Sequence, residues 1–133
     1  MLTLVTGLSG FTGPYIKTEF EKNGHKVIGL NSDLIDSKAI TAEIKQIQPD
    51  TVVHLAGISF VKHENINTIY DVNLMGTRNL LAALEQEAIN IKSILLVSSA
   101  NIYGNRSEAI LQENAAPDPS NDYAVSKLAM ENM

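Results

Sequence analysis

The sequence predicts an α/β fold in which helices cover both faces of a doubly wound parallel sheet. Short apolar runs rich in β-branched residues alternate with longer segments whose apolar residues recur every three or four positions. Strands and helices that alternate in this way form parallel sheets with right-handed crossovers. A glycine-rich segment follows the first run, and polar residues follow later ones. Because ligands of such sheets bind beyond the carboxyl ends of the strands, these segments are the candidate site.

The elements follow from apolar periodicity and from the turn residues that bound each segment. The predicted strands are Leu2–Thr6, Lys26–Leu30, Thr51–Leu55 and Ser93–Ser98. The predicted helices are Thr12–Asn23, Lys38–Gln48 with Ser37 as its N-cap, a long helix through Ile69, Val72, Gly76, Leu80 and Leu84, and a last helix that begins at Tyr123. A loop rich in Asn, Pro and Asp, from about Asn101 to Asp122, precedes that last helix.

Composition limits the classes of function. The chain has 133 residues, a hydrophobic fraction of 44%, a formal net charge of −5 and no cysteine. Residues 1–133 are therefore predicted to be one domain with a core of its own. The acidic balance disfavours nucleic acid as a partner, because phosphate binding needs a basic face. With no cysteine, and with His25, His54 and His63 at no metal-binding spacing, no metal is predicted. Neither a membrane-spanning run nor a signal peptide is recognisable, which predicts no membrane partner and a cytoplasmic location.

The segment Gly7–Gly13 spaces three glycines three residues apart between the first strand and the first helix. Glycine permits a tight turn and a close approach of backbone to a pyrophosphate, and it lets the helix pack on the strand. The start of the helix then offers N–H groups and the positive end of its dipole to phosphates. In this context we expect Gly7, Gly10 and Gly13 to bind NAD or NADP in a Rossmann-type domain.

The end of the second strand leaves the choice between the two cofactors open. An acid there would bind the adenosine ribose hydroxyls and favour NAD. This sequence has Asn31, which does not repel a 2′-phosphate as an acid would, and no arginine stands nearby to attract one. Asp33 follows two residues later and is predicted to contact adenine, with a ribose contact or a solvated turn as alternatives.

Tyr123 and Lys127 are four residues apart, which places them on one face of a helix. A free phenol titrates near pH 10, and a neighbouring cation stabilises the phenolate, so this spacing suits a general acid/base. Ser99, at the end of the last strand, is expected to orient the same substrate oxygen. Together with the glycine loop, these residues predict a catalytic site rather than an ordinary helix face.

Several motifs in order along the chain resemble the extended short-chain dehydrogenase/reductase family, also called the NAD-dependent epimerase/dehydratase family. They are Thr6–Gly13 (TGLSGFTG), the DLID segment 33–36, Leu55-Ala56-Gly57, Asn73–Thr77 (NLMGT), Ser98–Gly104 (SSANIYG) and Tyr123–Lys127. In the family the DLID-type segment follows a third strand, and the stretch before it is nearly absent here. Within the family, the sequence is most similar to reductases of GDP-4-keto-6-deoxymannose type.

The resemblance implies a role for each matching residue. Ser99, Tyr123 and Lys127 correspond to the catalytic residues, with Lys127 also holding the cofactor ribose. Phe11 is implied to bind the cofactor together with the loop glycines, and Leu34 is implied to bind it together with Asp33. The residues Leu55, Ala56 and Gly57 line the cofactor pocket, and Asn73 braces the central helix. The implied ligands are NAD or NADP and a nucleotide-linked sugar, and the implied assembly of the full-length enzyme is a homodimer.

Two departures from the family pattern refine the expected function. The dehydratases carry acids where this chain has Ala100 and Asn101, and elimination of water needs an acid, so a dehydratase is disfavoured. Family members also continue into a substrate-binding region after the Tyr–Lys helix. The chain is therefore expected to be the N-terminal fragment of a longer enzyme, truncated before that region and inactive alone. The expected activity is 4-keto reduction or epimerisation, with a cofactor-sensing regulator and a reductase of small ketones as alternatives.

Overall fold

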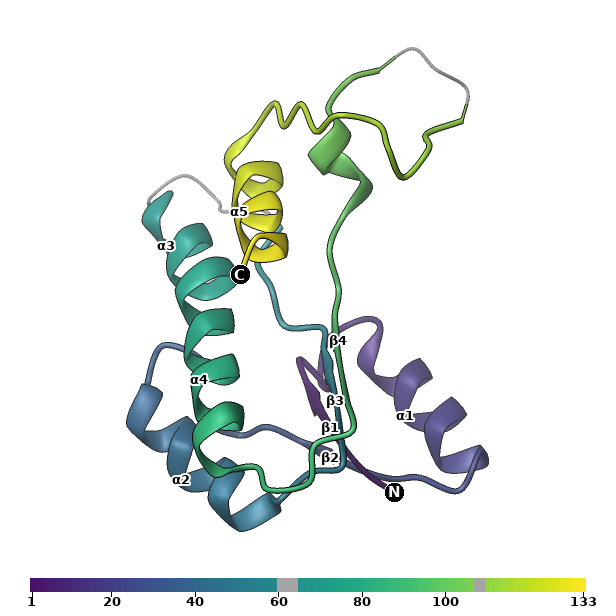
Figure 1. Ribbon diagram of the computed structural model, residues 1–133, viewed down its shortest axis with the longest axis vertical. Helices are drawn as coiled ribbons and strands as arrows, with labels where there is room; N and C mark the ends of the chain where they lie inside the picture. The colour runs from purple at the N-terminus through teal and green to yellow at the C-terminus, as the bar shows by residue number, and fades with distance from the viewer. Residues whose placement is uncertain (60–64, 107–109) are drawn as a thin grey trace.

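The computed structural model describes residues 1–59, 65–106 and 110–133 as three layers around a parallel sheet (Figure 1). The strands are β1 (Leu2–Thr6), β2 (Lys26–Gly29), β3 (Thr51–His54) and β4 (Ser93–Leu96). Helix α1 (Gly13–Lys22) lies on one face of the sheet, and α2 (Ser37–Ile47) and α4 (Thr77–Glu87) lie on the other. This arrangement confirms the predicted Rossmann-type fold.

The sheet has the strand order β2-β1-β3-β4, and each of its pairs is parallel. Thr6 of β1 is in register with His54 of β3, and His54 with Leu96 of β4. The last residues of these strands therefore lie at one edge of the sheet. The segments that follow them, including the glycine loop, meet at that edge.

The core lies between the sheet and the layer of α2 and α4. Its fully buried members come from four elements: Leu4 of β1, Val52 of β3, Ile40 and Ile44 of α2, and Leu80 and Leu84 of α4. Ile40 and Ile44 are one turn apart and so share the buried face of α2. Burial of each such side chain stabilises the fold by roughly 1.5–3 kcal/mol before entropy is counted. This packing fixes where the helices start relative to the strand ends.

The start of α2 corrects one prediction. Ser37 was expected to cap this helix, but it is the first helical residue, and Asp36 is the N-cap. The Asp36 Oδ1 atom accepts a hydrogen bond of 3.0 Å from the Ala39 N–H. A carboxylate also interacts more favourably than a hydroxyl with the positive end of the helix dipole, which explains the preference. At the other end, Gln48 takes a left-handed conformation with φ of 48° and ends the helix.

The long central helix contains an irregularity that the sequence did not predict. It runs as α3 (Asn67–Tyr70), a π-helical stretch η1 (Asp71–Gly76) and α4. A π-helical turn inserts an extra residue, which rotates the side chains before it relative to those after it. Both Asn73 within the stretch and Thr77 after it are fully buried. They are four residues apart and therefore share the inward face of this helix.

The last helix, α5 (Asp122–Glu131), packs beside α3 and η1 near the carboxyl edge of the sheet (Figure 1). Its N-cap is Asn121, whose Oδ1 atom accepts a hydrogen bond of 2.9 Å from the Ala124 N–H. Asp122 accepts a hydrogen bond of 2.7 Å from the Tyr70 hydroxyl, and this bond raises the pKa of that phenol. These two bonds fix where the first turn of α5 lies. None of the helices among the described residues is long and apolar enough to cross a membrane.

We predict that Asp36→Ala lowers the free energy of unfolding by about 1 kcal/mol, because the first turn of α2 loses its cap. Ser37→Ala is the matched control, since Ser37 caps nothing, and we expect a change within about 0.5 kcal/mol. Urea denaturation of both variants measures the difference. A larger loss for Ser37→Ala than for Asp36→Ala would contradict the assignment of the cap.

Candidate active site

The glycine loop between β1 and α1 has a conformation that side chains would prevent at two positions. Gly7 has a φ of +69°, and a Cβ atom there would lie 2.9 Å from the Ala56 backbone nitrogen. A Cβ atom on Gly13 would collide with the backbone of Leu8. The loop closes on itself through a hydrogen bond of 3.0 Å from the Gly10 N–H to the Gly7 carbonyl. Gly7 thus fits against the segment after β3, and Gly13 allows α1 to start directly against the loop.

The N-terminus of α1 faces this loop without a side-chain cap. Thr12 is the N-cap residue, and its side chain makes no capping hydrogen bond. Pro14 occupies the first turn, where a missing N–H costs nothing. Uncapped N–H groups and the positive end of the helix dipole make such a terminus suited to a phosphate group.

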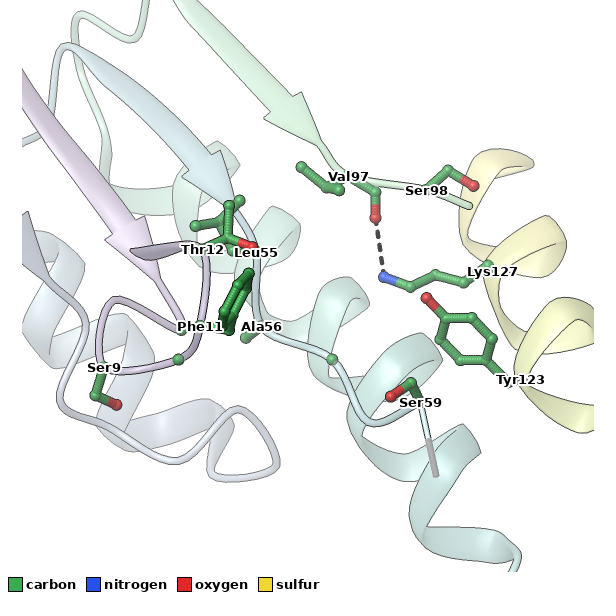
Figure 2. A pocket seen from close by; sticks show the side chains of 13 residues that line it. Ser9, Phe11, Thr12, Leu55, Ala56, Ser59, Val97, Ser98, Tyr123 and Lys127 are labelled. Atoms are coloured by element: carbon green, nitrogen blue, oxygen red, sulfur yellow. Dashed lines mark hydrogen bonds between the residues drawn. The ribbon is translucent and has the colours of Figure 1, made fainter. Parts of the chain in front are cut away.

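Two hollows of similar size lie on either side of the glycine loop. The first, of about 570 Å³, lies towards β3, β4 and α5 (Figure 2). Its lining comprises Gly7, Ser9, Gly10, Phe11, Thr12, Leu55, Ala56, Gly57, Ser59, Val97, Ser98, Tyr123 and Lys127. The second, of about 550 Å³, lies towards β2 and is lined by Gly7, Leu8, Ser9, Pro14, Lys17, Ile28, Gly29, Leu30 and Asn31. Because both include Gly7 and Ser9, they adjoin, and an elongated ligand can lie in both with its middle over the loop.

Tyr123 and Lys127 project from α5 into the first hollow (Figure 2). Lys127 is only 4% exposed, and its ammonium group donates a hydrogen bond of 2.9 Å to the Val97 carbonyl at the end of β4. Burial lowers the pKa of this lysine. A Cβ atom on Gly57 would lie 3.2 Å from the Lys127 nitrogen, so the small residue at position 57 keeps space beside the ammonium group. The predicted pair is thus assembled next to the glycine loop.

Asn73 holds the segment after β3 and helix α5 together. Its Oδ1 atom accepts a hydrogen bond of 2.7 Å from the Ile58 N–H, and its Nδ2 atom donates one of 2.9 Å to the Ile58 carbonyl. Nδ2 also donates to the Ser126 hydroxyl at 3.0 Å. The Asn73 side chain lines neither hollow. It braces the wall of the site, which agrees with the bracing role expected from the sequence.

A chain of buried hydrogen bonds runs beneath the first hollow, and its direction follows from the donors. The Ala56 N–H donates to the Thr6 hydroxyl at 3.1 Å, and the Thr77 hydroxyl donates to the Asn73 carbonyl at 2.7 Å. Between them lies His54, with Nδ1 at 2.6 Å from the Thr6 hydroxyl and Nε2 at 2.8 Å from the Thr77 hydroxyl. Because the Thr77 proton is already committed, His54 must donate from Nε2. Burial lowers the pKa of His54 to about 4, so at neutral pH the imidazole is neutral, its proton is on Nε2, and Nδ1 accepts from the Thr6 hydroxyl.

The structure separates the predicted site residues into those that line the hollows and those that do not. The second hollow is lined by Asn31. The first hollow is lined by the other predicted residues that reach a hollow, which are Gly7, Gly10, Phe11, Leu55, Ala56, Gly57, Tyr123 and Lys127. Gly13, Asp33, Leu34 and Ser99 line neither. Leu34 is a core residue under Gly76, and the Asp33 carboxylate accepts a hydrogen bond from the Ile35 N–H within its own turn. The cofactor contacts expected for Asp33 and Leu34 stay predictions.

Two consecutive serines, Ser98 and Ser99, follow β4 and have different surroundings. Ser99 is the N-cap of the short helix η2 (Ala100–Tyr103), and its hydroxyl accepts a hydrogen bond of 3.2 Å from the Asn101 N–H. Its neighbour Ser98 lines the first hollow, and the Ser98 hydroxyl is buried with no hydrogen-bond partner in the described structure. The catalytic role of Ser99 stays a prediction, and Ser98 is a second polar group at the same strand end.

The histidines differ in their surroundings. His54 has no exposed surface, as expected for a structural histidine. His25 was expected to be exposed but is half-buried, with Nδ1 at 2.8 Å from the Thr3 hydroxyl and its ring against Phe20. His63 lies outside the described residues. No group of three His, Asp or Glu side chains within those residues could hold a metal ion.

Sequence reasoning missed four further residues of the first hollow: Ser9, Thr12, Ser59 and Val97. It also missed Lys17, a cation in the second hollow. Ser9 and Thr12 lie between the glycines, and Ser59 follows Gly57 by two residues, so proximity to the motifs was a usable signal. Lys17 reaches the hollow from α1 and had no such signal.

A sequence model of the family described as "NAD dependent epimerase/dehydratase family" matches residues 3–133. The chain belongs to this family. The epimerase/dehydratase family assignment confirms the resemblance that the motifs indicated, and it agrees with the two hollows beside a glycine loop.

Two curated relatives within the epimerase/dehydratase family are 36% identical to this chain. GDP-6-deoxy-D-talose 4-dehydrogenase of Aggregatibacter actinomycetemcomitans aligns with 100% of this chain and 47% of its own length. GDP-6-deoxy-D-mannose reductase of Pseudomonas aeruginosa aligns with 97% of this chain and 44% of its own length. The chain thus spans about half the length of the curated relatives it matches.

Solved structures of the family superpose closely on the fold. UDP-glucose 4-epimerase of Thermus thermophilus in complex with NAD is 28% identical, with a TM-score of 0.88 over 99% of this chain and 49% of that one. RMD of Pseudomonas aeruginosa in complex with NADPH is 32% identical, with a TM-score of 0.84 over 98% of this chain and 46% of that one. Both forms of the cofactor therefore occur among proteins similar to this chain.

We predict that His54 makes the protein less stable as the pH falls from about 6.5 to about 4. Burial, with a smaller repulsion from the Lys127 cation, lowers the pKa of His54 to about 4. The unfolded chain therefore takes up a proton in this range while the folded chain does not. The contribution of the neutral His54 to the free energy of unfolding is fully present above about pH 6.5 and declines below it. The loss amounts to about 3 kcal/mol.

Urea unfolding of wild type and His54→Gln at several pH values isolates this contribution from that of the carboxyl groups. The free-energy difference between the two proteins should shrink as the pH falls through this range. His25→Gln serves as the control for a half-buried histidine. A difference between wild type and His54→Gln that stays constant with pH would show that His54 is not held neutral.

Proposed function

We propose that the protein containing this chain is an NAD(P)-dependent oxidoreductase that reduces the 4-keto group of a nucleotide-linked 6-deoxy sugar. The observation that carries the proposal is the position of Tyr123 and Lys127 in the hollow that opens onto the glycine loop. The two 36% identical relatives, named for GDP-linked 6-deoxy sugars, support this substrate class. A homodimer remains the expectation for the full-length protein.

The residues present fit a dinucleotide. Its pyrophosphate would lie over Gly7 and Gly10, where Cβ atoms are absent and the N-terminus of α1 supplies a positive dipole end. Its adenosine half would lie in the hollow beside Asn31, and its nicotinamide half in the hollow beside Tyr123. When bound, the reduced nicotinamide supplies a hydride to the carbonyl carbon of the substrate.

Residues of this chain supply the proton that the substrate oxygen needs. As the carbonyl carbon gains the hydride, its oxygen gains negative charge, and the Tyr123 hydroxyl donates a proton to it. The Lys127 ammonium group stabilises the phenolate that remains. Because Lys127 is held by the Val97 carbonyl, this charge is in place before the substrate arrives. A serine hydroxyl at the end of β4 would donate a hydrogen bond to the same oxygen and orient it.

We predict that Tyr123→Phe lowers kcat by about 10²–10⁴-fold, because the variant cannot donate the proton. Lys127→Met should lower kcat and also weaken cofactor binding, since Lys127 lines the cofactor hollow. The measurement is loss of reduced-nicotinamide absorbance with a GDP-linked 4-keto-6-deoxy sugar and the full-length protein. Tyr15→Phe is the control, because this exposed phenol lines neither hollow. Wild-type turnover of Tyr123→Phe across the pH range would overturn the assignment.

We also predict that the cofactor exchanges during each turnover, as a net reduction requires fresh reduced cofactor. An epimerase returns the hydride to its substrate and can retain its nucleotide. The purified full-length protein should therefore lose bound nucleotide on dialysis, and its activity should depend on added NADH or NADPH. Stoichiometric nucleotide that survives dialysis would instead favour a 4-epimerase.

A further inference from the structure

The turn that follows β2 surrounds a carboxylate from another element. Glu43 of α2 accepts four hydrogen bonds there from two consecutive residues. Asn31 donates from its backbone N–H at 2.9 Å and from Nδ2 at 3.1 Å to Oε1. Ser32 donates from its backbone N–H at 2.7 Å and from its hydroxyl at 2.5 Å to Oε2. Both carboxylate oxygens are thus engaged, and the orientation of the Asn31 amide is fixed, because an ionised carboxylate only accepts.

This carboxylate is ionised at neutral pH. Partial burial raises the pKa of Glu43, but the hydrogen bonds from Ser32 and Asn31 outweigh burial, and the pKa lies below its ordinary value. Four donors with fixed geometry also hold the side chain in one place, unlike a free surface glutamate. A full negative charge is therefore fixed at the carboxyl end of β2.

Asn31 links this charge to the hollow that lies beside β2. Asn31 lines that hollow together with Ser9 and Lys17, whereas Glu43 stands behind Asn31 and lines neither hollow. In a dinucleotide-binding sheet, the group at the end of the second strand faces the adenosine ribose, and an acid there selects its free hydroxyls. Here the strand itself supplies an amide, and the negative charge comes from α2.

We propose that Glu43 makes the site select NAD(H), whose adenosine ribose has a free 2′-hydroxyl, over the 2′-phosphorylated cofactor. The inference rests on the function proposed above and assigns the choice to a residue outside the cofactor contacts. Glu43 acts through Asn31 and Ser32 and is therefore a positioning and selectivity residue rather than a catalytic one.

Two effects exclude the 2′-phosphate. A phosphate monoester has a charge of about −1.5 to −2 at neutral pH, so it is repelled by the nearby Glu43 carboxylate. The donors that would otherwise bind it, the N–H groups and side chains of Asn31 and Ser32, are already used by Glu43. A 2′-hydroxyl meets neither obstacle. Since Nδ2 of Asn31 donates to Glu43, and no described residue donates to Oδ1, this oxygen is left to accept a hydrogen bond from the ribose.

The Lys17 cation would attract a 2′-phosphate, but more weakly than Glu43 repels it. It is the one cation among the described residues that line this hollow. Its side chain is 47% exposed, and its nitrogen lies 3.9 Å from the Glu21 carboxylate. A solvated, flexible ammonium group gains little from an added anion, because water and salt screen the attraction. The Glu43 charge is held by four hydrogen bonds, so its repulsion dominates the selection.

The test is the ratio of dissociation constants for NADPH and NADH, measured by calorimetric titration of the full-length protein. Wild type should bind NADH more tightly. Glu43→Gln removes the charge and should shift the ratio towards NADPH by about tenfold or more. Glu43→Asp keeps the charge and should retain the preference for NADH. Glu85→Gln removes an exposed carboxylate on α4, away from both hollows, and should leave the ratio unchanged.

The ratio separates selectivity from a structural effect, because a loosened turn would weaken both cofactors equally. AMP and adenosine 2′,5′-bisphosphate provide a second titration in which the 2′-phosphate is the only difference, and they should show the same shift. A wild-type preference for NADPH, or a ratio unchanged in Glu43→Gln while both cofactors bind, would overturn this inference and leave the proposed function standing. Failure of wild type to bind either cofactor would overturn both.

Discussion

The neutral imidazole of His54 joins three parts of the structure that must keep fixed positions. Thr6, on one side of the ring, directly precedes the glycine loop, and Thr77, on the other, belongs to the central helix. The Thr6 hydroxyl also accepts the Ala56 N–H, so the wall of the first hollow is bonded to the same chain. Every proton in this chain has one allowed position. Removal of any member leaves a buried donor or acceptor unpaired, which costs about 1–3 kcal/mol.

Asn73, which lies in the π-helical stretch, extends this network to helix α5. The Asn73 carbonyl accepts a hydrogen bond from the Thr77 hydroxyl, which is the last bond of the chain through His54. The Asn73 side chain is hydrogen-bonded to Ile58 and to Ser126. Helix α5, which carries Tyr123 and Lys127, is therefore positioned through the same buried groups that position the glycine loop. The two halves of the proposed chemistry share one rigid support.

The sequence predicted what local sterics and short spacings determine. Strand and helix order, the glycine loop and the Tyr123–Lys127 pair depend on neighbours a few residues apart, and the structure brings the loop and the pair into one hollow. The predicted ends of α1 and α2 and the predicted start of α5 were accurate to one residue. Asp36 rather than Ser37 caps α2, because adjacent candidate caps compete through small differences in geometry. The choice between Ser98 and Ser99 is of the same kind. Periodicity alone also gave no sign of the π-helical stretch.

Contacts between distant segments set the features that sequence reasoning did not predict. The half-burial of His25 depends on Thr3 and Phe20, and the presence of Lys17 in a hollow depends on how α1 lies against β2. The most consequential case is the charge at the end of β2, since position 31 has an amide and the acid comes from residue 43, twelve positions away. A prediction based only on the residue at the end of β2 therefore misses a charge that comes from helix α2.

The short connection between β2 and α2 explains why the charge comes from the helix. Only residues 30–36 separate the two elements, so α2 starts close to the end of β2. β2 is also the terminal strand of the described sheet, so no further strand covers the turn at residues 31–32. The polar N–H groups of that turn need a partner, and Glu43, which lies on α2 one residue before the buried Ile44, is placed to provide it. The same bonds that satisfy this turn place a negative charge where a dinucleotide's ribose would lie, so a structural requirement of the turn also bears on cofactor choice.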